Sequence, residues 1–395
     1  MKRVAKNLSL LALALPLALQ VGAARARQCV PAPSKAKAPA ESGANAGPIE
    51  FQRFGSFMFG GSVDRSPNGE TFHGDHGYVQ YYIPTHSRDL PLVMWHGSGQ
   101  SGKTWETTPD GRDGFDHIFP RRGWSVFIVD QPRRGRAGKT SAHEGSTNHN
   151  PSATESSLWA NFRMGVWTPP GLPTFFPGVQ FPKDPASIDQ FLRQQTFNTG
   201  AELFPSAEQR DFEARTMADL LRRTGPAVLL SHSHSGQYGW ATAMLVPNLV
   251  KAVVAYEPGE YAFPEGEKVA DIPTKNELLA KFMAPQFVSK EAFKNLTKMP
   301  IMIVFGDNIS TKPGNDYGIE LWRMVRLRAQ QFADTVKRYG GDVRIVDLPA
   351  IGICGNTHFP MSDLNNLDVS NQLSDFLHEK RLDDQTGGYL GPDAK

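Results

Sequence analysis

The sequence predicts an α/β fold, with a mostly parallel, doubly wound sheet covered by helices on both faces. Short, continuously apolar runs recur along the chain, which is typical of strands buried on both faces of a parallel sheet. Helix-like stretches separate these runs, and such alternation favours a doubly wound sheet. The chain has 395 residues, of which 39% are hydrophobic and 21% charged, so it can build a large core.

The expected elements follow one another with few gaps. Two early strands are predicted at residues 54–60 and 76–83. The buried runs are residues 91–95, 124–130, 227–230, 252–255, 301–305 and 343–346. The predicted helices are residues 207–223, 237–245, 321–339 and 370–380.

One segment interrupts this alternation. Residues 141–198 contain no clear buried strand but are rich in aromatic side chains. A long insertion of this kind usually forms a cap or a binding loop, so we expect Trp159, Phe162 and Trp167 to contact a ligand. The alternative is a surface embellishment packed by its own aromatic residues. A smaller insertion is expected at residues 260–298.

The N-terminus has the pattern of an export signal. Lys2, Arg3 and Lys6 precede an apolar run of 14 residues, Leu8 to Val21, which ends in small residues. We therefore expect a signal peptide at residues 1–26, a disordered leader at 27–50 and the folded domain at 51–395, in a secreted or periplasmic protein. An uncleaved anchor is the alternative, but the run is short for a membrane span.

Charge and cysteine content narrow the possible partners. Cleavage after Ala26 removes four basic residues and no acid, which takes the formal charge from +2 to −2. Neither nucleic acid nor membrane insertion is then expected, whereas a homo-oligomer is compatible with the sequence. Cys29 and Cys354 could form a disulfide in an oxidising compartment, although their positions in the sequence do not establish one. No cysteine–histidine grouping has the spacing of a structural zinc site.

The strongest local signal is the stretch Ala227-Val-Leu-Leu-Ser-His-Ser-His-Ser-Gly236, an apolar run that ends in a turn of small residues. A nucleophile elbow needs small residues two before and two after the reactive serine, because the turn is crowded. Ser233 fits, with Ser231 and Ser235 in the small positions. Ser235 fits less well as the nucleophile, since Gln237 would occupy its second small position. Serine-rich turns also occur as ordinary helix caps.

A general base for Ser233 is available in the expected order. His358 follows the last apolar run, in a loop that contains glycine and precedes the final helix. A serine hydroxyl is a weak nucleophile until an adjacent imidazole takes its proton. The elbow and this histidine together predict the α/β-hydrolase fold, which needs no metal or organic cofactor for acyl transfer.

An oxyanion hole requires two backbone N–H donors. We expect one from His234, directly after the nucleophile, and one from Ser98, in the loop that follows residues 91–95, with Gly99 as the neighbouring candidate. Residues 97–104 of this loop also match the phosphate-loop pattern Gly-x-x-x-x-Gly-Lys-Thr. A nucleotide site explains neither the Ser233 turn nor His358, so it is kept only as an alternative.

Several motifs are shared with one known family. They are His96-Gly97, Thr104-Trp-Glu-Thr-Thr-Pro-Asp-Gly-Arg112, Val129-Asp-Gln131, Ser231-His-Ser-His-Ser-Gly236, Glu257-Pro-Gly-Glu260, and Thr357-His358 with Asp363-Leu-Asn-Asn366. From about Phe51 to the C-terminus the chain resembles the bacterial esterase 713 family, whose members are serine carboxylesterases of the α/β-hydrolase fold. The resemblance implies that Glu257 is the acid of the triad. At Ser98-Gly99 the sequence departs from the family archetype, which has adjacent cysteines there.

Two acids compete for the role of orienting His358. Glu257 directly follows residues 252–256, and its long side chain could reach the histidine. Asp307 follows residues 301–305, where most α/β-hydrolases place this acid, but it could simply cap its own loop. We favour Glu257, and we expect Glu260 to be a solvated loop charge.

The sequence thus predicts a secreted serine carboxylesterase with the triad Ser233, Glu257 and His358. The same machinery could instead act on lactones, amides or polyesters. A non-catalytic binding protein on a hydrolase scaffold is the alternative from another class, because a fold does not fix a function.

Overall fold

The computed structural model describes residues 29, 47–138, 154–196, 198–199 and 206–393. The predicted signal peptide and most of the predicted leader lie outside these residues, as do residues 141–153 of the larger insertion. Cys29 is described, and it forms a disulfide with Cys354, 325 residues further along the chain. This bond fixes one point of the leader against the loop that leads to His358.

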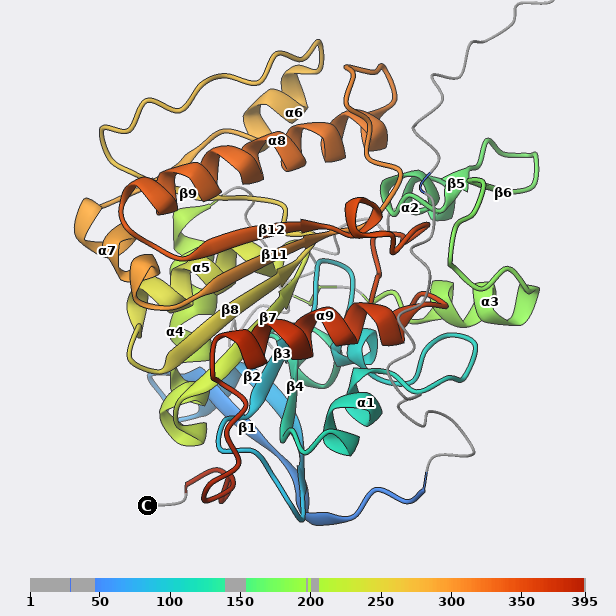
Figure 1. The fold of residues 1–395 in the computed structure, drawn as a ribbon. Helices are drawn as coiled ribbons and strands as arrows, with labels where there is room; N and C mark the ends of the chain where they lie inside the picture. Colours follow the sequence, from blue (N-terminus) through green and yellow to red (C-terminus); the bar gives the residue numbers. More distant parts are fainter. Residues whose placement is uncertain (1–28, 30–46, 139–153, 197, 200–205, 394–395) are drawn as a thin grey trace, which may run out of the picture.

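An eight-stranded sheet forms the centre of the molecule (Figure 1). Its order is β1-β2-β4-β3-β7-β8-β11-β12. The strands are β1 Phe51–Arg65, β2 Thr71–Pro84, β3 Leu92–Trp95, β4 Val126–Asp130, β7 Ala227–His232, β8 Val250–Tyr256, β11 Ile301–Phe305 and β12 Val343–Asp347. The pairs β1–β2 and β2–β4 are antiparallel and the remaining pairs are parallel, as the mostly parallel prediction required.

Both faces of the sheet are buried, because successive strand residues enter two separate cores. Along β3, for example, Val93 and Trp95 pack in one core while Leu92 and Met94 pack in the other. The first core is covered by α4 (Ala207–Thr224), α5 (Ser235–Leu245) and α8 (Tyr317–Arg338). The second is covered by α1 (Phe115–Arg121) and α9 (Asn366–Glu379). This alternation explains why the strands are continuously apolar in sequence.

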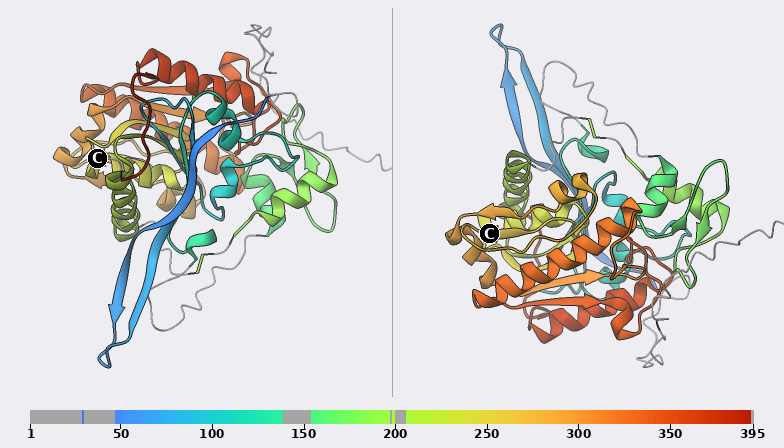
Figure 2. Two further views of the ribbon diagram at one scale, coloured as in Figure 1. Left: turned by 90° about the horizontal axis from the view of Figure 1, so that it is seen from below. Right: turned by 90° about the horizontal axis from the view of Figure 1, so that it is seen from above.

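The first two strands are much longer than predicted. Strands β1 and β2 form a hairpin of 15 and 14 residues that extends well beyond the body of the protein (Figure 2). Its outer part includes polar and glycine residues, such as Ser62 and Gly61, that carry no apolar signal. Pairing within the hairpin, rather than burial, therefore sets its length, and pairing of this kind is not visible in a hydrophobic pattern.

Residues 154–196 of the larger insertion lie at one end of the sheet, beyond the carboxyl ends of the parallel strands (Figure 1). The described part of the insertion contains α2 (Glu155–Asn161), β5 (Gly165–Val166), β6 (Thr174–Phe175) and α3 (Pro185–Arg193). The expectation of no clear buried strand holds for this part, since β5 and β6 are only two residues each. The smaller insertion contains β9 (Ala262–Pro264), α6 (Glu277–Phe282), β10 (Gln286–Val288) and α7 (Lys290–Lys294).

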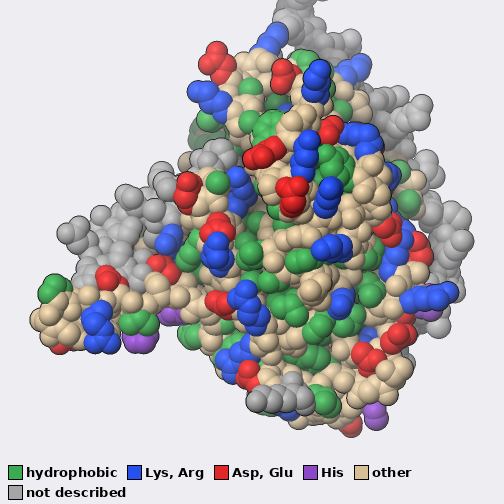
Figure 3. All heavy atoms as spheres, turned by 90° about the vertical axis from the view of Figure 1, so that its left-hand side faces the viewer, with side chains coloured by type: hydrophobic (Ala, Val, Ile, Leu, Met, Phe, Trp, Pro, Cys, Tyr) green, Lys and Arg blue, Asp and Glu red, His purple; other side chains and the backbone are tan. Residues whose placement is uncertain are grey.

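The surface carries charges of both signs. On the face shown in Figure 3, acidic and basic side chains are interspersed rather than gathered in a patch of one sign. Within the described residues, no helix has both the length and the apolar character needed to cross a membrane.

Candidate active site

Ser233 lies in a sharp turn between β7 and α5. Its φ of 55° is in the left-handed region, which is uncommon for a residue with a side chain and occurs in strained turns at functional sites. The Ser233 N–H donates to the Tyr256 carbonyl at 2.9 Å, and its own carbonyl accepts from Gly236 at 3.0 Å. The turn therefore holds a half-buried serine beyond the end of the strand.

Two neighbours of this turn require small residues. A Cβ on Gly97 would lie 2.8 Å from Ser233 Cβ, so the loop after β3 passes directly against the serine. A Cβ on Gly236 would lie 2.4 Å from Pro258 Cβ, since α5 packs closely on the segment after β8. Ser235 is fully buried, and its hydroxyl bonds the carbonyls of Trp95 and His232. Ser235 therefore holds the turn together, and the half-buried Ser233 is the more accessible of the two serines.

The loop after β12 brings His358 to this turn. His232, the last residue of β7, connects the turn to this loop: its Nε2 lies 2.8 Å from the His358 carbonyl, and the ring centroids of His232 and His358 are 4.7 Å apart. Asp363 fixes the loop from the other side, accepting hydrogen bonds from Thr357 N at 2.7 Å and Thr357 Oγ1 at 2.9 Å. Among the described residues, the Ser233 hydroxyl makes no hydrogen bond. This does not count against Ser233 as a nucleophile, because hydrogen bonds between catalytic groups are often long before a substrate binds.

Glu257, at the end of β8, is the acid that reaches His358. Its Oε2 lies 3.4 Å from His358 Nδ1, and both side chains are at most 2% exposed. The Asp307 carboxylate instead accepts backbone hydrogen bonds, from Asn308 N in its own loop at 2.7 Å and from Gly355 N in the loop after β12 at 2.8 Å. Of the two competing acids, Glu257 is thus the one whose carboxylate lies beside the His358 ring.

Arg163 is a member of this site that sequence reasoning missed. Its Nη2 lies 2.6 Å from Glu257 Oε1, and its side chain is 2% exposed. The Glu257 carboxylate therefore lies between a guanidinium on one side and the His358 imidazole on the other. A single arginine in a long insertion gives no sequence signal of its own, so only the fold could place it here.

Burial and charge set the protonation states of these groups. Burial alone would raise the pKa of Glu257, but Arg163 and His358 outweigh it and lower that pKa to about 2. Burial lowers the pKa of His358 below its ordinary value, and the hydrogen bond to Glu257 only partly offsets this effect. Burial also lowers the pKa of His232, well below the ordinary range. Near neutral pH, the site thus holds an ionised carboxylate beside a neutral imidazole that can accept a proton.

The loop after β3 has the position of the predicted oxyanion loop. Ser98 lies on its exposed part, and within the described part of the chain its N–H donates no hydrogen bond. Gly99 has a φ of 68°, and its carbonyl accepts from Thr196 N at 2.8 Å, which ties this loop to the larger insertion. His234 is the cap residue at the start of α5, and N–H groups at a helix start have no partner within the helix.

The phosphate-loop alternative for residues 97–104 fails on this geometry. A phosphate loop opens a helix whose N-terminus receives the anion. Here the segment leads into a four-residue 3-10 turn, Gly102–Trp105, and Lys103 Nζ bonds the Thr107 carbonyl.

The three aromatic residues predicted to contact a ligand lie at different depths. Phe162 stacks on the His358 ring, with the ring planes 12° apart and the centroids 5.5 Å apart. Trp159 is 1% exposed and packs edge-on against Trp167 and Phe175. Of the three rings, Phe162 is the one that stacks on His358, the predicted base.

The expectation of a solvated Glu260 was wrong. Its side chain is 2% exposed, and Oε1 lies 3.5 Å from His234 Nδ1. The chain after β8 turns inward, because the Glu260 carbonyl accepts from the buried indole of Trp240 at 3.0 Å. In the sequence, a glutamate that follows a glycine gives no indication that the chain turns toward the core at this point.

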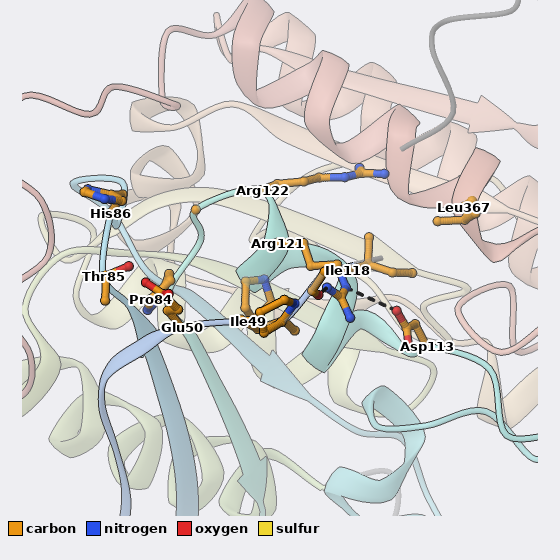
Figure 4. Close-up of a pocket in the computed structure, with 14 residues that line it drawn as sticks. Ile49, Glu50, Pro84, Thr85, His86, Asp113, Ile118, Arg121, Arg122 and Leu367 are labelled. Atoms are coloured by element: carbon orange, nitrogen blue, oxygen red, sulfur yellow. Dashed lines mark hydrogen bonds and ion pairs between the residues drawn. The ribbon is translucent and has the colours of Figure 1, made fainter. Parts of the chain in front are cut away.

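A cleft elsewhere in the molecule is separate from this site. It is lined by residues before β1, at the end of β2, in and around α1, and in the first turn of α9 (Figure 4). Arg121 points toward Asp113 there, with Nε 3.3 Å from Oδ2. Ser233, Glu257 and His358 do not line this cleft and lie after the carboxyl ends of their strands.

Comparison with known proteins agrees with this architecture. A bacterial esterase solved at atomic resolution is 30% identical and has a TM-score of 0.66, with 85% of this chain and 98% of that chain covered. A fungal protein named probable secreted lipase phiG (Fungal sp., strain ATCC 74256) is 28% identical over 333 residues, which cover 77% of this chain and 86% of the relative. No family model matches the chain. At this identity and coverage, the chain belongs to the bacterial esterase family of α/β-hydrolases.

Proposed function

We propose that the protein is an exported serine carboxylesterase in which Ser233 is the nucleophile, His358 the general base and Glu257 the acid that orients it. In reaction class, the chain is a serine hydrolase acting on ester bonds, in line with its esterase and lipase relatives. One observation carries the finer assignment. Ser233 has a strained φ directly after His232, whose Nε2 lies 2.8 Å from the His358 carbonyl, and the buried Glu257 carboxylate lies 3.4 Å from the His358 imidazole.

Acylation follows from these groups. Glu257 stays ionised and accepts a hydrogen bond from the Nδ1–H of His358, which leaves Nε2 unprotonated and able to take the Ser233 proton. Ser233 Oγ then attacks the ester carbonyl, and the oxyanion forms beside the N–H groups of Ser98 and His234. His358 passes its proton to the leaving alcohol as the carbon–oxygen bond breaks, and an acyl-Ser233 remains.

Deacylation repeats the sequence with water. His358 removes a proton from a water molecule, whose oxygen attacks the acyl carbonyl. The bond to Ser233 Oγ breaks, the serine recovers its proton from His358, and a carboxylic acid leaves. Every proton in both steps is exchanged with this one imidazole.

We further propose that residues 141–198 cap the site, with Phe162 nearest to the substrate and with Trp159 and Trp167 behind it. Phe162 supports this assignment because its ring lies against the base itself. Trp159 and Trp167 pack against each other, so they would shape the cap from within.

We also propose export through a signal peptide at residues 1–26, which the Cys29–Cys354 disulfide supports, since such bonds persist in oxidising compartments.

A hydrolysis screen tests the proposal. The purified protein and its Ser233→Ala variant are assayed on p-nitrophenyl esters of increasing acyl length, a lactone, an anilide and a polyester film. Ester turnover that disappears in the variant supports an esterase, and faster turnover of the lactone, anilide or film would reassign the substrate class. If the protein turns over no substrate in a Ser233-dependent way, it is a binding protein on a hydrolase scaffold.

A further inference from the structure

We propose that Arg163 is a positioning residue, through which the larger insertion sets both the orientation of Glu257 and the charge that His358 faces. This inference rests on the roles proposed above for Glu257 and His358. If Arg163 acts in this way, the insertion influences the proton transfer at His358 as well as the selection of the substrate.

The guanidinium of Arg163 connects three of the loops that form the site. Its Nη2 lies 2.6 Å from Glu257 Oε1, after β8. Its Nε donates to the Asp307 carbonyl at 2.8 Å, after β11, and Nη2 reaches the Thr357 carbonyl at 3.5 Å, next to His358. A planar group with several fixed donors can hold such an arrangement, whereas a lysine ammonium cannot reproduce it.

The backbone beside Arg163 also contacts the base. The His358 N–H donates to the Phe162 carbonyl at 2.9 Å. Trp322, on α8, closes the arrangement: its ring lies 4.8 Å from the Arg163 guanidinium and 4.3 Å from the centre of the His358 ring. The insertion therefore contacts His358 directly through the Phe162 carbonyl and the Phe162 ring, and indirectly through the Arg163 guanidinium, which binds Glu257.

The conformation of Arg163 is costly, which suggests a role other than stability. The residue follows the end of α2 with a φ of 56°, in a position where helices usually place glycine. Its Nη1 is buried and makes no hydrogen bond among the described residues. Buried ion pairs often contribute less to stability than apolar packing of the same volume. Strained backbone and an incompletely bonded charge are features that cluster at functional sites.

The charge of Arg163 has a predictable effect on the base. The charged and titratable groups around His358 are Glu257 after β8, Arg163 in the insertion, His232 on β7, Asp307 after β11, and Asp363 in its own loop. Glu257 favours the imidazolium, whereas burial and Arg163 disfavour it and lower the pKa of His358. Removal of the arginine charge should therefore raise this pKa, and the acid limb of kcat/KM should move to higher pH.

The test compares Arg163→Gln and Arg163→Lys with the wild-type enzyme in pH profiles of kcat and kcat/KM. We expect R163Q to move the acid limb to higher pH and to lose between about tenfold and a hundredfold in kcat, because small misplacements at a site cost this much. R163K should keep the limb in place but still lose kcat, since it keeps the charge and loses the bridging geometry. Arg193→Gln is the matched control, because Arg193 lies in α3 of the same insertion and forms an exposed ion pair with Asp189.

A limb that stays in place in folded R163Q would overturn the inference, as would a R163K variant with wild-type kcat. If R163Q does not fold, R163K alone decides: a lower kcat with an unmoved acid limb supports the inference, and a wild-type kcat or a moved acid limb overturns it. His358→Gln separates this inference from the proposed function. An active His358→Gln enzyme refutes the triad itself, whereas an inactive one together with an unmoved R163Q limb refutes only the role of Arg163.

Discussion

Nδ1 of His358 and Oε2 of Glu257 are 3.4 Å apart, and neither side chain is more than 2% exposed. The carboxylate comes from the end of β8 and the imidazole from the loop after β12, 101 residues apart in sequence. This contact is the geometric basis for assigning the acid to Glu257 rather than to Asp307.

Substitution of the two acids tests this assignment. Glu257→Gln should lower kcat by up to about 10⁴-fold, because an amide no longer selects the tautomer that leaves His358 Nε2 unprotonated. Asp307→Asn should have a much smaller effect, since the Asp307 carboxylate accepts backbone hydrogen bonds from Asn308 and from Gly355, in the loop after β12. Steady-state kinetics at equal folded fraction, measured by circular dichroism, make the comparison. A larger kcat loss in Asp307→Asn would transfer the role to that residue.

The pH profile of the wild-type enzyme reports on the base. His358 must be neutral to accept a proton, and burial lowers its pKa from the ordinary value of 6.5. Activity should therefore fall only as the pH drops through this lowered pKa, so the acid limb of kcat/KM should lie below pH 6.5. A limb at or above pH 6.5, measured with a substrate that does not itself titrate, would contradict the protonation state assigned to this site.

The aromatic residues of the insertion should divide into two kinds. Phe162→Ala should change the preference between short-chain and long-chain esters, because the ring stacks on His358. Trp159→Ala should mainly lower stability, by about 3–5 kcal/mol as for other buried large aromatic residues. Ratios of kcat/KM for two esters, together with thermal unfolding, distinguish the two effects. Equal changes in selectivity for both variants would show that the rings act as one unit.

Ser235 should be structural. Its hydroxyl accepts from His232 N at 3.0 Å and bonds the Trp95 carbonyl at 3.1 Å, so Ser235→Ala should cost about 1–3 kcal/mol of stability. The folded fraction should retain its activity. Urea titration followed by an assay under native conditions checks both points. A stable but inactive Ser235→Ala protein would mean that the nucleophile has been assigned two residues too early.

Much of this architecture follows from local sequence signals. The buried strands are continuously apolar because both faces of the sheet are covered, and this pattern predicts β3, β4, β7, β8, β11 and β12. The Ser233 turn is visible because steric crowding restricts its neighbours to small residues. The position of His358 follows from the order of elements in the fold.

Other parts depend on contacts between distant segments, which leave little trace in one sequence. Arg163 meets Glu257 across 94 residues, and no local pattern distinguishes it from a surface arginine. Glu260 is buried because its chain segment turns inward beneath Trp240, and a charged residue between glycine and tyrosine looks solvated. The length of the β1–β2 hairpin depends on pairing between its own strands.

Covalent labelling tests the central claim most directly. The purified protein is treated with a fluorophosphonate, digested and analysed by mass spectrometry, alongside the Ser233→Ala variant. We predict one phosphonylated residue, Ser233, in the wild-type protein and none in the variant, whose ester hydrolysis should fall by about 10⁶-fold, as on loss of other serine nucleophiles. Phosphonylation of Ser235 or of any other serine, or labelling and turnover that persist in folded Ser233→Ala, would contradict the account.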